Sequence, residues 1–310
     1  MTKPYKEIAN TKNLTRQEWL DLRKDYIGGS EAGAIAGLNP WASPASVWLS
    51  KTSETIEDID NERMRIGRDL EDYVARRFSE ATGKKVRRNN HMMVSCEWPW
   101  MLADIDREVV GEDSLLECKT TGSYSKSDWQ DGQVPPHYYA QVQHYLAVTG
   151  KAKGYIAVLI GNEQFLWYEI ERDEEYIASL VEIERAFYEK SMVAGGFPEP
   201  DGSQAYSSAL RERFSTSDGS QVHLDGLDDV ASEYVAIRAK IKELEQESKE
   251  YEQKIQLAMG DAEKGETTDH QFTWKTITTN RFDKKRFEED HPELAESYYY
   301  QSAYRRFSVK

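Results

Sequence analysis

The chain of 310 residues is 39% hydrophobic and 31% charged, which excludes global disorder and allows about two average domains or one enlarged core. Its 40 basic and 55 acidic residues give a net charge of −15, which argues against a protein that binds nucleic acid through an overall cationic surface. Two cysteines, Cys96 and Cys118, are too few for a disulfide framework, a four-cysteine zinc site or an iron–sulfur cluster, and the lack of a signal-type or membrane-length apolar stretch predicts a soluble, cytoplasmic protein that binds no membrane.

A short helix is predicted near the N-terminus, after a polar leader at residues 1–13. The sequence Thr15-Arg16-Gln17-Glu18 is a capping box, in which the first and last side chains each bond the other's backbone N–H. This motif predicts a helix from Thr15 to about Lys24.

Small residues and prolines interrupt the chain after this helix. Ile27-Gly28-Gly29-Ser30 ends it, and Ser30 can cap a second helix of small residues that ends near Gly37. Between Trp41 and Trp48 we expect two turns anchored by proline. Residues 54–60 are predicted to form an acidic loop.

A long amphipathic helix is predicted from Glu62 to Ala81. From Ile66 onward its apolar residues recur every fourth position, as one face of a helix requires, and Gly83 is a suitable C-terminal cap. The apolar residues are Met64, Ile66, Leu70, Val74 and Phe78.

Short apolar segments then predict antiparallel strands at His91–Ser95, Trp100–Val110 and Ser114–Lys119. A helix from about His137 to Thr149, a hairpin over residues 154–171 and a helix from Asp173 to Ala194 follow. This order of elements predicts an α/β (α+β) fold, with a mixed, largely antiparallel central sheet flanked by helices.

The composition changes near residue 197, which predicts a core at 1–197, a linker at 198–224 rich in Pro, Gly and Ser, and a C-terminal region at 225–310. In that region apolar positions alternate spacings of four and three between Val230 and Ala258, a heptad seam with Ser248 as its one polar position. We expect a long helix packed on its own domain rather than an intermolecular coiled coil. A small α/β tail with a basic aromatic end follows.

Three charged residues on the predicted strands carry the most chemical information. Side chains alternate along a strand, so Glu117 and Lys119 share one face, and Asp106 lies on the preceding strand. Two carboxylates and a lysine at a hairpin edge suit metal-assisted phosphodiester hydrolysis, because Mg²⁺ prefers oxygen ligands and activates a bound water. The alternative is an exposed ion pair. We favour the site, because Leu115, Leu116 and Cys118 are apolar and a charge on a buried strand is costly.

This constellation resembles the PD-(D/E)xK nuclease superfamily, and the chain around it resembles its lambda-type exonuclease and YqaJ-like viral recombinase branch. The family's Pro-Asp is represented here by Ile105-Asp106. Asp104, two residues earlier, stays an alternative ligand to Asp106. The matching segments are Trp19–Ser30, Ala34–Trp41, Gly67-Arg-Asp-Leu-Glu71, Gln141-Val-Gln-His-Tyr145 and, less specifically, Trp274–Phe307.

The resemblance implies an Mg²⁺-dependent enzyme, with Mn²⁺ able to substitute, that degrades one strand of linear double-stranded DNA from its 5′ end and leaves a 3′ overhang. Asp106, Glu117 and Lys119 would be catalytic. The metal ligands implied by the family are Glu71, Asp106, Glu117 and the backbone carbonyl of Cys118. The residues implied to bind DNA or phosphate are Arg23, Ser30, Gln141 and Tyr145.

The same resemblance implies a phage or prophage protein of the bacterial cytoplasm that forms a ring-shaped trimer and works with a single-strand annealing protein. No phosphate-binding loop is present in the sequence, so no nucleotide cofactor is expected. Residues 61–90 hold nine basic residues against five acidic ones, a local excess that favours a DNA channel in an acidic body. The alternatives are a structure-specific or nicking endonuclease of the same fold, and a non-catalytic DNA-binding or assembly subunit.

Overall fold

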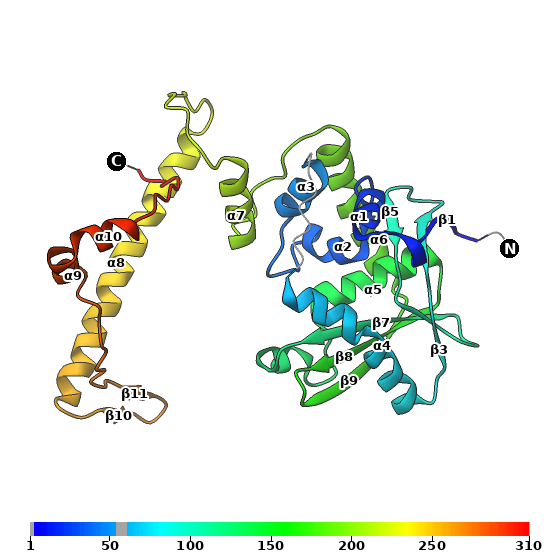
Figure 1. Cartoon of the computed structure of the whole chain (residues 1–310), viewed down its shortest axis with the longest axis horizontal. Helices are drawn as coiled ribbons and strands as arrows, with labels where there is room; N and C mark the ends of the chain where they lie inside the picture. The colour runs from blue at the N-terminus through cyan, green and yellow to red at the C-terminus, as the bar shows by residue number, and fades with distance from the viewer. Residues whose placement is uncertain (1–2, 54–60, 310) are drawn as a thin grey trace. The chain divides into compact units, whose positions relative to one another are not determined.

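The computed structural model describes residues 3–53 and 61–309, so the predicted acidic loop at 54–60 lies outside the described residues. The chain divides into two compact units, residues 1–214 and 215–310 (Figure 1). Among the described residues, no helix combines the length and the apolar character needed to cross a membrane.

Two sheets form the framework of the first unit. The first sheet has the strand order β1 (Tyr5–Asn10), β4 (His91–Ser95), β5 (Met101–Ala103) and β2 (Ile27–Gly28). The second has the order β3 (Val86–Arg88), β6 (Arg107–Val109), β7 (Ser114–Thr121), β8 (Lys153–Ile160) and β9 (Gln164–Glu171). Strands β7 and β8 run parallel, and the other neighbours in this second sheet are antiparallel, so the mixed, largely antiparallel sheet is confirmed.

Helices surround these sheets. They are α1 (Arg16–Arg23), α2 (Gly29–Ile35), α3 (Pro44–Thr52), α4 (Glu62–Thr82), α5 (Pro136–Thr149), α6 (Glu174–Phe187) and α7 (Gln204–Arg213). A π-helical turn, Tyr188–Val193, extends α6, and short 3₁₀ turns lie at Thr11–Asn13 and Ser123–Trp129.

The alternation of side chains along β7 decides what each face of the second sheet packs against. Leu115 points into the large cluster that contains Val142 and Leu146 of α5. Leu116 points into the opposite cluster, which contains Val74 and other residues of α4. Helices α4 and α5 therefore cover opposite faces of this sheet (Figure 1), and β7 is buried between them.

Several local predictions are confirmed by the hydrogen bonds at helix ends. The N–H of Glu18 donates to Thr15 Oγ1 at 3.3 Å, and the N–H of Thr15 donates to Glu18 Oε2 at 2.7 Å, which completes the capping box of α1. Gly83 ends α4 in the left-handed conformation, with φ of 73°.

Other local predictions were wrong near the N-terminus. The expected polar leader contains β1, which pairs with β4. The expected turns before Trp48 are replaced by α3, because Pro44 occupies the first helical position, where it needs no N–H donor, and Ser43 caps the helix. Ser30 is not an N-cap, because α2 begins at Gly29.

The expected single strand from Trp100 to Val110 is two strands in different sheets. Strand β5 pairs in the first sheet and β6 in the second. The three residues between them, Asp104, Ile105 and Asp106, form the crossing point, and the side chain of Ile105 is buried. This interruption places the two candidate aspartates at the junction of the sheets.

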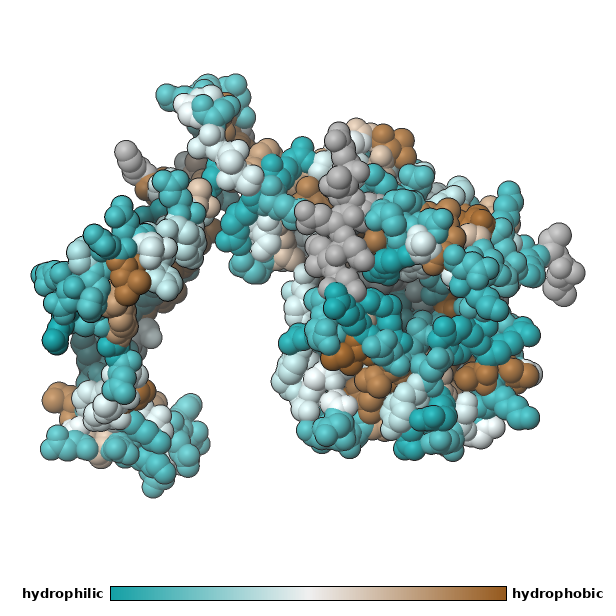
Figure 2. All heavy atoms as spheres, viewed as in Figure 1, coloured by the Kyte–Doolittle hydropathy of each residue, from teal (hydrophilic) through white to brown (hydrophobic). Residues whose placement is uncertain are grey.

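The second unit contains α8 (Asp228–Met259), the hairpin β10 (Lys264–Glu266) and β11 (Gln271–Thr273), and two short helices, α9 (Lys284–Asp290) and α10 (Pro292–Ser297). The expected long helix is present; none of its side chains is buried, and within its own unit Tyr234 contacts Phe307, with 5.7 Å between the ring centres. Apolar residues are visible among the hydrophilic ones on this unit (Figure 2). Helix α7 lies within the segment expected to be a linker, and it packs on α3 through Tyr206 and Ala209.

Candidate active site

The candidate site lies where β7 extends beyond its neighbour β6. The last pair between these strands joins Arg107 to Leu116. Beyond it, β7 continues through Glu117, Cys118 and Lys119 with only β8 beside it. One edge of β7 is therefore open to side chains from other elements.

Asp106 takes the place that a strand would occupy at this edge. Its Oδ2 accepts a hydrogen bond of 2.7 Å from the N–H of Cys118. Because the N–H and C=O of one residue point to the same edge of a strand, the carbonyl of Cys118 also faces this edge. The backbone thus brings a carboxylate and a carbonyl to one place.

Glu117 is buried beside them, with 4% of its surface exposed. Its Oε1 accepts hydrogen bonds of 2.7 Å from Lys119 Nζ and 2.7 Å from Gln141 Nε2. Its Oε2 is buried and has no hydrogen-bond partner in the structure. A buried carboxylate oxygen without a partner is costly, and a cation is the group that compensates it best.

Lys119 lies on the same face of β7 as Glu117, as predicted. Its ammonium donates to Glu117 Oε1 and, at 2.9 Å, to Gln141 Oε1, and it stands 4.9 Å from the centre of the Tyr138 ring. An ammonium has three protons to donate, so one remains for a water or a phosphate oxygen.

The ionisation of these groups is shifted by their surroundings. Burial, with the nearby charges of Glu117 and Glu71, raises the pKa of Asp106 well above its ordinary value. Burial also raises the pKa of Glu117, against the opposing effect of Lys119. Burial lowers the pKa of Lys119, but Glu117, together with Tyr138 and Asp106, more than offsets this, and the pKa is raised. The site therefore gathers more negative charge than one lysine neutralises.

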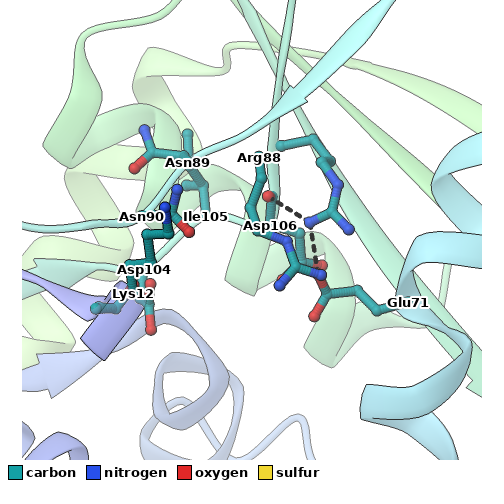
Figure 3. A pocket seen from close by; sticks show the side chains of 10 residues that line it. Lys12, Glu71, Arg88, Asn89, Asn90, Asp104, Ile105 and Asp106 are labelled. Atoms are coloured by element: carbon teal, nitrogen blue, oxygen red, sulfur yellow. Dashed lines mark hydrogen bonds and ion pairs between the residues drawn. The ribbon is translucent and has the colours of Figure 1, made fainter. Parts of the chain in front are cut away.

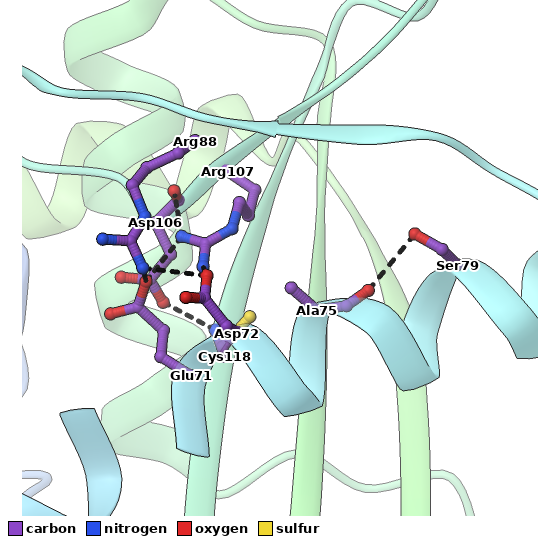
Figure 4. A network of polar contacts seen from close by, with 8 residues as sticks. All are labelled: Glu71, Asp72, Ala75, Ser79, Arg88, Asp106, Arg107 and Cys118. Carbon is purple, nitrogen blue, oxygen red and sulfur yellow. Dashed lines mark hydrogen bonds and ion pairs between the residues drawn. The ribbon is translucent and has the colours of Figure 1, made fainter. Parts of the chain in front are cut away.

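Glu71, from α4, approaches this site but is engaged by arginines (Figure 4). Arg107 donates to Glu71 Oε1, to Asp72 Oδ1 and to the carbonyl oxygen of Asp106, and Arg88 lies 3.5 Å from Glu71 Oε1. In the described residues, no three carboxylate, imidazole or thiol groups are arranged closely enough to hold a metal ion as they stand. Asp106, Glu117 and the Cys118 carbonyl fit a Mg²⁺ site by donor chemistry, whereas Glu71 would first have to leave Arg107.

Both candidate aspartates line a polar cavity of about 380 Å³ (Figure 3). Asp104 Oδ2 accepts a 2.7 Å hydrogen bond from the indole N–H of Trp19, and burial raises its pKa. Of these two aspartates, only Asp106 forms a hydrogen bond with β7 in the described structure. The geometry thus favours Asp106 over Asp104 as the partner of Glu117.

The two residues assigned to phosphate binding, Arg23 and Ser30, are in contact. Arg23 Nη2 donates to Ser30 Oγ at 3.1 Å, and its guanidinium stacks 4.3 Å from the ring centre of Trp19. Trp19 also bonds Asp104, so it connects this pair to the polar cavity. Arg23 lies 3.8 Å from Glu31, which forms a closer ion pair of 2.8 Å with Lys51.

Gln141 and Tyr145 lie on the face of α5 that meets β7, rather than on an open surface. Gln141 bonds both Glu117 and Lys119, and its Nε2 also donates to the Tyr145 hydroxyl at 3.2 Å. Both side chains are 4% exposed. In this structure they support the charged pair and do not present a surface to DNA.

Gly29 is the glycine that makes room for Tyr145. A Cβ added at Gly29 would lie 2.4 Å from Tyr145 Cε1, whereas one at Gly67 would meet only Thr120 Oγ1 at 3.5 Å. We expect Gly29→Ala to lower the free energy of unfolding by about 1–3 kcal/mol through overpacking, and Gly67→Ala to cost nothing. Urea unfolding of both variants checks this, and equal stabilities would contradict it.

Three residues that contact the candidate site residues were not identified from the sequence. Arg107 binds Glu71, Tyr138 lies beside Lys119, and Trp19 joins Arg23 to Asp104. The signal for Arg107 was its position directly after Asp106 on a strand, where an arginine is rarely buried without a carboxylate partner. Nothing in the sequence pairs the other two with their partners.

A solved structure shares the fold of part of this chain, and a second one resembles it more weakly. An alkaline exonuclease (LHK-Exo) from Laribacter hongkongensis matches with a TM-score of 0.50 and 21% identity, over 57% of this chain and 93% of that chain. A phage-related exonuclease from Haemophilus somnus 129PT matches with a TM-score of 0.44 and 12% identity, over 57% of this chain and 100% of that chain. The likeness to the first of these structures confirms the predicted fold of the PD-(D/E)xK type.

The sequence comparisons are more specific. The model of the YqaJ-like viral recombinase domain matches residues 18–152. Protein YqaJ of Bacillus subtilis (strain 168) is 38% identical over 308 residues, which cover 98% of this chain and 97% of that protein. The chain therefore belongs to the YqaJ-like viral recombinase family, and the resemblance inferred from the motifs is confirmed.

Proposed function

We propose that this protein is a Mg²⁺-dependent 5′-to-3′ exonuclease that acts on linear double-stranded DNA and leaves 3′ single-stranded overhangs for recombination by strand annealing. The observation that carries the proposal is the unpartnered, buried Oε2 of Glu117 beside Asp106 and Lys119. A buried carboxylate without a partner lowers the stability of the fold, and such groups are typical of sites that bind a cation or a substrate.

The chain's own residues would divide the work as follows. Asp106, Glu117 and the Cys118 carbonyl would hold Mg²⁺, or Mn²⁺ in its place, with Glu71 joining once it is released from Arg107. The metal would supply Lewis-acid stabilisation of the phosphate and a lowered pKa for a water. Lys119, fixed by Glu117 and Gln141, would orient that water with its remaining N–H.

A groove of about 520 Å³, lined in part by Thr120, the residue after Lys119, offers a path for a DNA strand. Its lining includes Tyr138, which contacts Lys119, the exposed aromatic rings of Trp41 and Tyr124, and Arg63 of α4. Aromatic rings bind unpaired bases by stacking, and arginine binds phosphates. This groove supports DNA as the substrate.

Arg23 is expected to recognise a 5′-terminal phosphate together with Ser30. Loss of a charge-assisted hydrogen bond costs about 1.5–3 kcal/mol, so Arg23→Ala should digest 5′-phosphorylated ends about 10- to 100-fold more slowly. Digestion from 5′-hydroxyl ends should change little. The matched control is Arg16→Ala, because Arg16 stacks on the same Trp19 ring at 4.5 Å. An equal loss on both kinds of end would contradict the assignment.

The assembly follows from the family resemblance and is part of this proposal. Three nuclease units would form a ring around the DNA, and a single-strand annealing protein in the bacterial cytoplasm would receive the exposed 3′ strand. A closed ring keeps hold of DNA without nucleotide hydrolysis.

The test uses the full chain, Mg²⁺ and a linear duplex labelled at the 5′ or the 3′ end, with a closed circular duplex beside it. We expect labelled mononucleotides from the 5′ end, an untouched circle, and no product in EDTA. Cutting of the circle would instead identify an endonuclease. Binding without any cleavage would identify a non-catalytic DNA-binding or assembly subunit.

A further inference from the structure

The long helix of the second unit, α8, carries an apolar seam that the described part of the chain leaves accessible to solvent. The exposed fractions are 60% at Val230, 58% at Ile237, 53% at Leu244 and 55% at Tyr251. The helix has 32 residues and would be about 48 Å long. Within its own unit the seam is covered only in part, by Phe307 at Tyr234, with 5.7 Å between the ring centres, and by Phe272 and Trp274 near Ile255. A partner helix would bury the rest of it.

The charges beside the seam indicate which helix fits. Two copies of α8 can lie side by side in opposite directions, with Ile241 facing Leu244 of the second copy and Tyr234 facing Tyr251 of the second copy. In this alignment every pair of charged side chains flanking the seam is of opposite sign. The pairs are Glu233 with Lys254, Lys240 with Glu247, and Arg238 with Glu245.

Other alignments bring like charges together. Two parallel copies in register place Glu247 against Glu252 of the second copy. Antiparallel copies shifted by one heptad place either Lys240 or Glu247 against itself. The first antiparallel alignment also sets the polar Ser248 against Ile237 of the second copy, whereas the parallel one buries two serines together.

A groove at one end of the seam matches the same alignment. It has a volume of about 410 Å³, and Ser248, Tyr251 and Ile255 of α8 line it together with Phe272 and Trp274 of the hairpin region. In the antiparallel alignment, the apolar residues near the start of the second copy's α8 would enter this groove. The β10–β11 hairpin region would then cover part of the partner's α8 as well as part of α8 in its own chain.

We propose that α8 pairs with α8 of a second copy of this chain as an antiparallel coiled coil, centred between Lys242 and Glu243. The pairing is a function of the second unit and does not depend on the nuclease proposal. It is two-fold symmetric, so with a three-membered ring of nuclease units it would join chains of different rings.

Disulfide cross-linking tests the alignment directly. The exposed Cys96 is first replaced by serine, and Lys240→Cys and Glu247→Cys are then introduced singly and together. Seven residues on one helix span about 10 Å, beyond the reach of a disulfide, so a bond between these positions must join two chains. We expect oxidation to give a covalent dimer on a non-reducing gel for the double variant only. No dimer from it, or equal cross-linking by either single variant, would overturn the proposal.

Charge reversal tests the same alignment through the strength of association between chains. Each variant is compared with the unchanged chain, so any association through the nuclease units is common to both. Lys240→Glu should weaken association about tenfold in sedimentation equilibrium, since two pairs per dimer become repulsive. Lys240→Glu with Glu247→Lys should restore it. Lys242→Glu, outside the flanking positions, is the control. Failure of the double reversal to restore association would contradict the alignment.

Discussion

Replacement of Lys119 by alanine is expected to abolish DNA cleavage while leaving DNA binding in place. Lys119 donates hydrogen bonds to Glu117 and Gln141, and its third N–H is left to bind a water or a phosphate oxygen. Loss of a group that acts only on the reacting atoms lowers turnover and not affinity, and we expect a fall of about 10³-fold or more.

The experiment measures release of labelled mononucleotides in Mg²⁺ and the equilibrium affinity for the same duplex in EDTA. Lys153→Ala is the matched control, since Lys153 lies on the neighbouring strand β8 and pairs at the surface with Glu169 at 3.0 Å. Removal of a buried ammonium leaves Glu117 uncompensated, with a stability cost of about 3 kcal/mol, so circular dichroism must show a folded variant. Cleavage at the unchanged rate would exclude Lys119 from the mechanism.

Asp106→Asn is expected to stop cleavage and at the same time to stabilise the metal-free protein, by about 1 kcal/mol at pH 8. Asparagine can still accept the hydrogen bond from Cys118, but it carries no charge to repel Glu117 and Glu71. Asp104→Asn is the control, because Asp104 bonds Trp19 and not β7. We expect that variant to cleave within about tenfold of the unchanged protein.

The dependence of stability on pH follows from the raised pKa of Asp106. Between its unfolded pKa and its higher folded pKa, the folded protein binds more protons, so stability falls as pH rises through that window. This loss of stability is complete above the folded pKa of Asp106. Because asparagine does not ionise, Asp106→Asn should remove this contribution to the pH dependence. Saturating Mg²⁺, at about 100 times its dissociation constant, should add about 2.7 kcal/mol to the unchanged protein and much less to the variant. Thermal unfolding with and without Mg²⁺ measures both effects.

Local sequence signals predicted the elements that are governed by local chemistry. The capping box at Thr15 and the glycine at Gly83 fix their helix ends with bonds to neighbouring residues. Alternation along β7 placed Glu117 and Lys119 on one face, because that face is decided by the pleat of a single strand. These features need no knowledge of the rest of the fold.

The crossing point between the sheets could not be predicted in this way. Ala103, Ile105 and Val109 are buried apolar residues separated by charged ones, so the alternation continues through the break and is typical of one long strand. Whether a strand stays in one sheet depends on its partners, and those lie far away in the sequence. The ion pair between Arg107 and Glu71 could not be predicted for the same reason, because it joins residues that are far apart in the sequence.

The assignment of Ser30 shows how a local signal can be overridden. Serine before a run of small residues is a good N-cap. Here, however, Gly28 precedes the helix, and its N–H is bonded at 2.8 Å by Glu31 Oε2. Ser30 is thereby available to Arg23, a role that composition and spacing do not reveal.

The bond between Cys118 and Asp106 makes one backbone amide a reporter of the site. Most amides of a central strand are protected from hydrogen exchange by carbonyls of a neighbouring strand, and they exchange only when the sheet opens. The amide of Cys118 is protected by a single carboxylate at the end of a side chain. Its exchange rate will therefore follow the movement of Asp106 alone, so isotope labelling could detect a rearrangement of the site while the sheet stays closed.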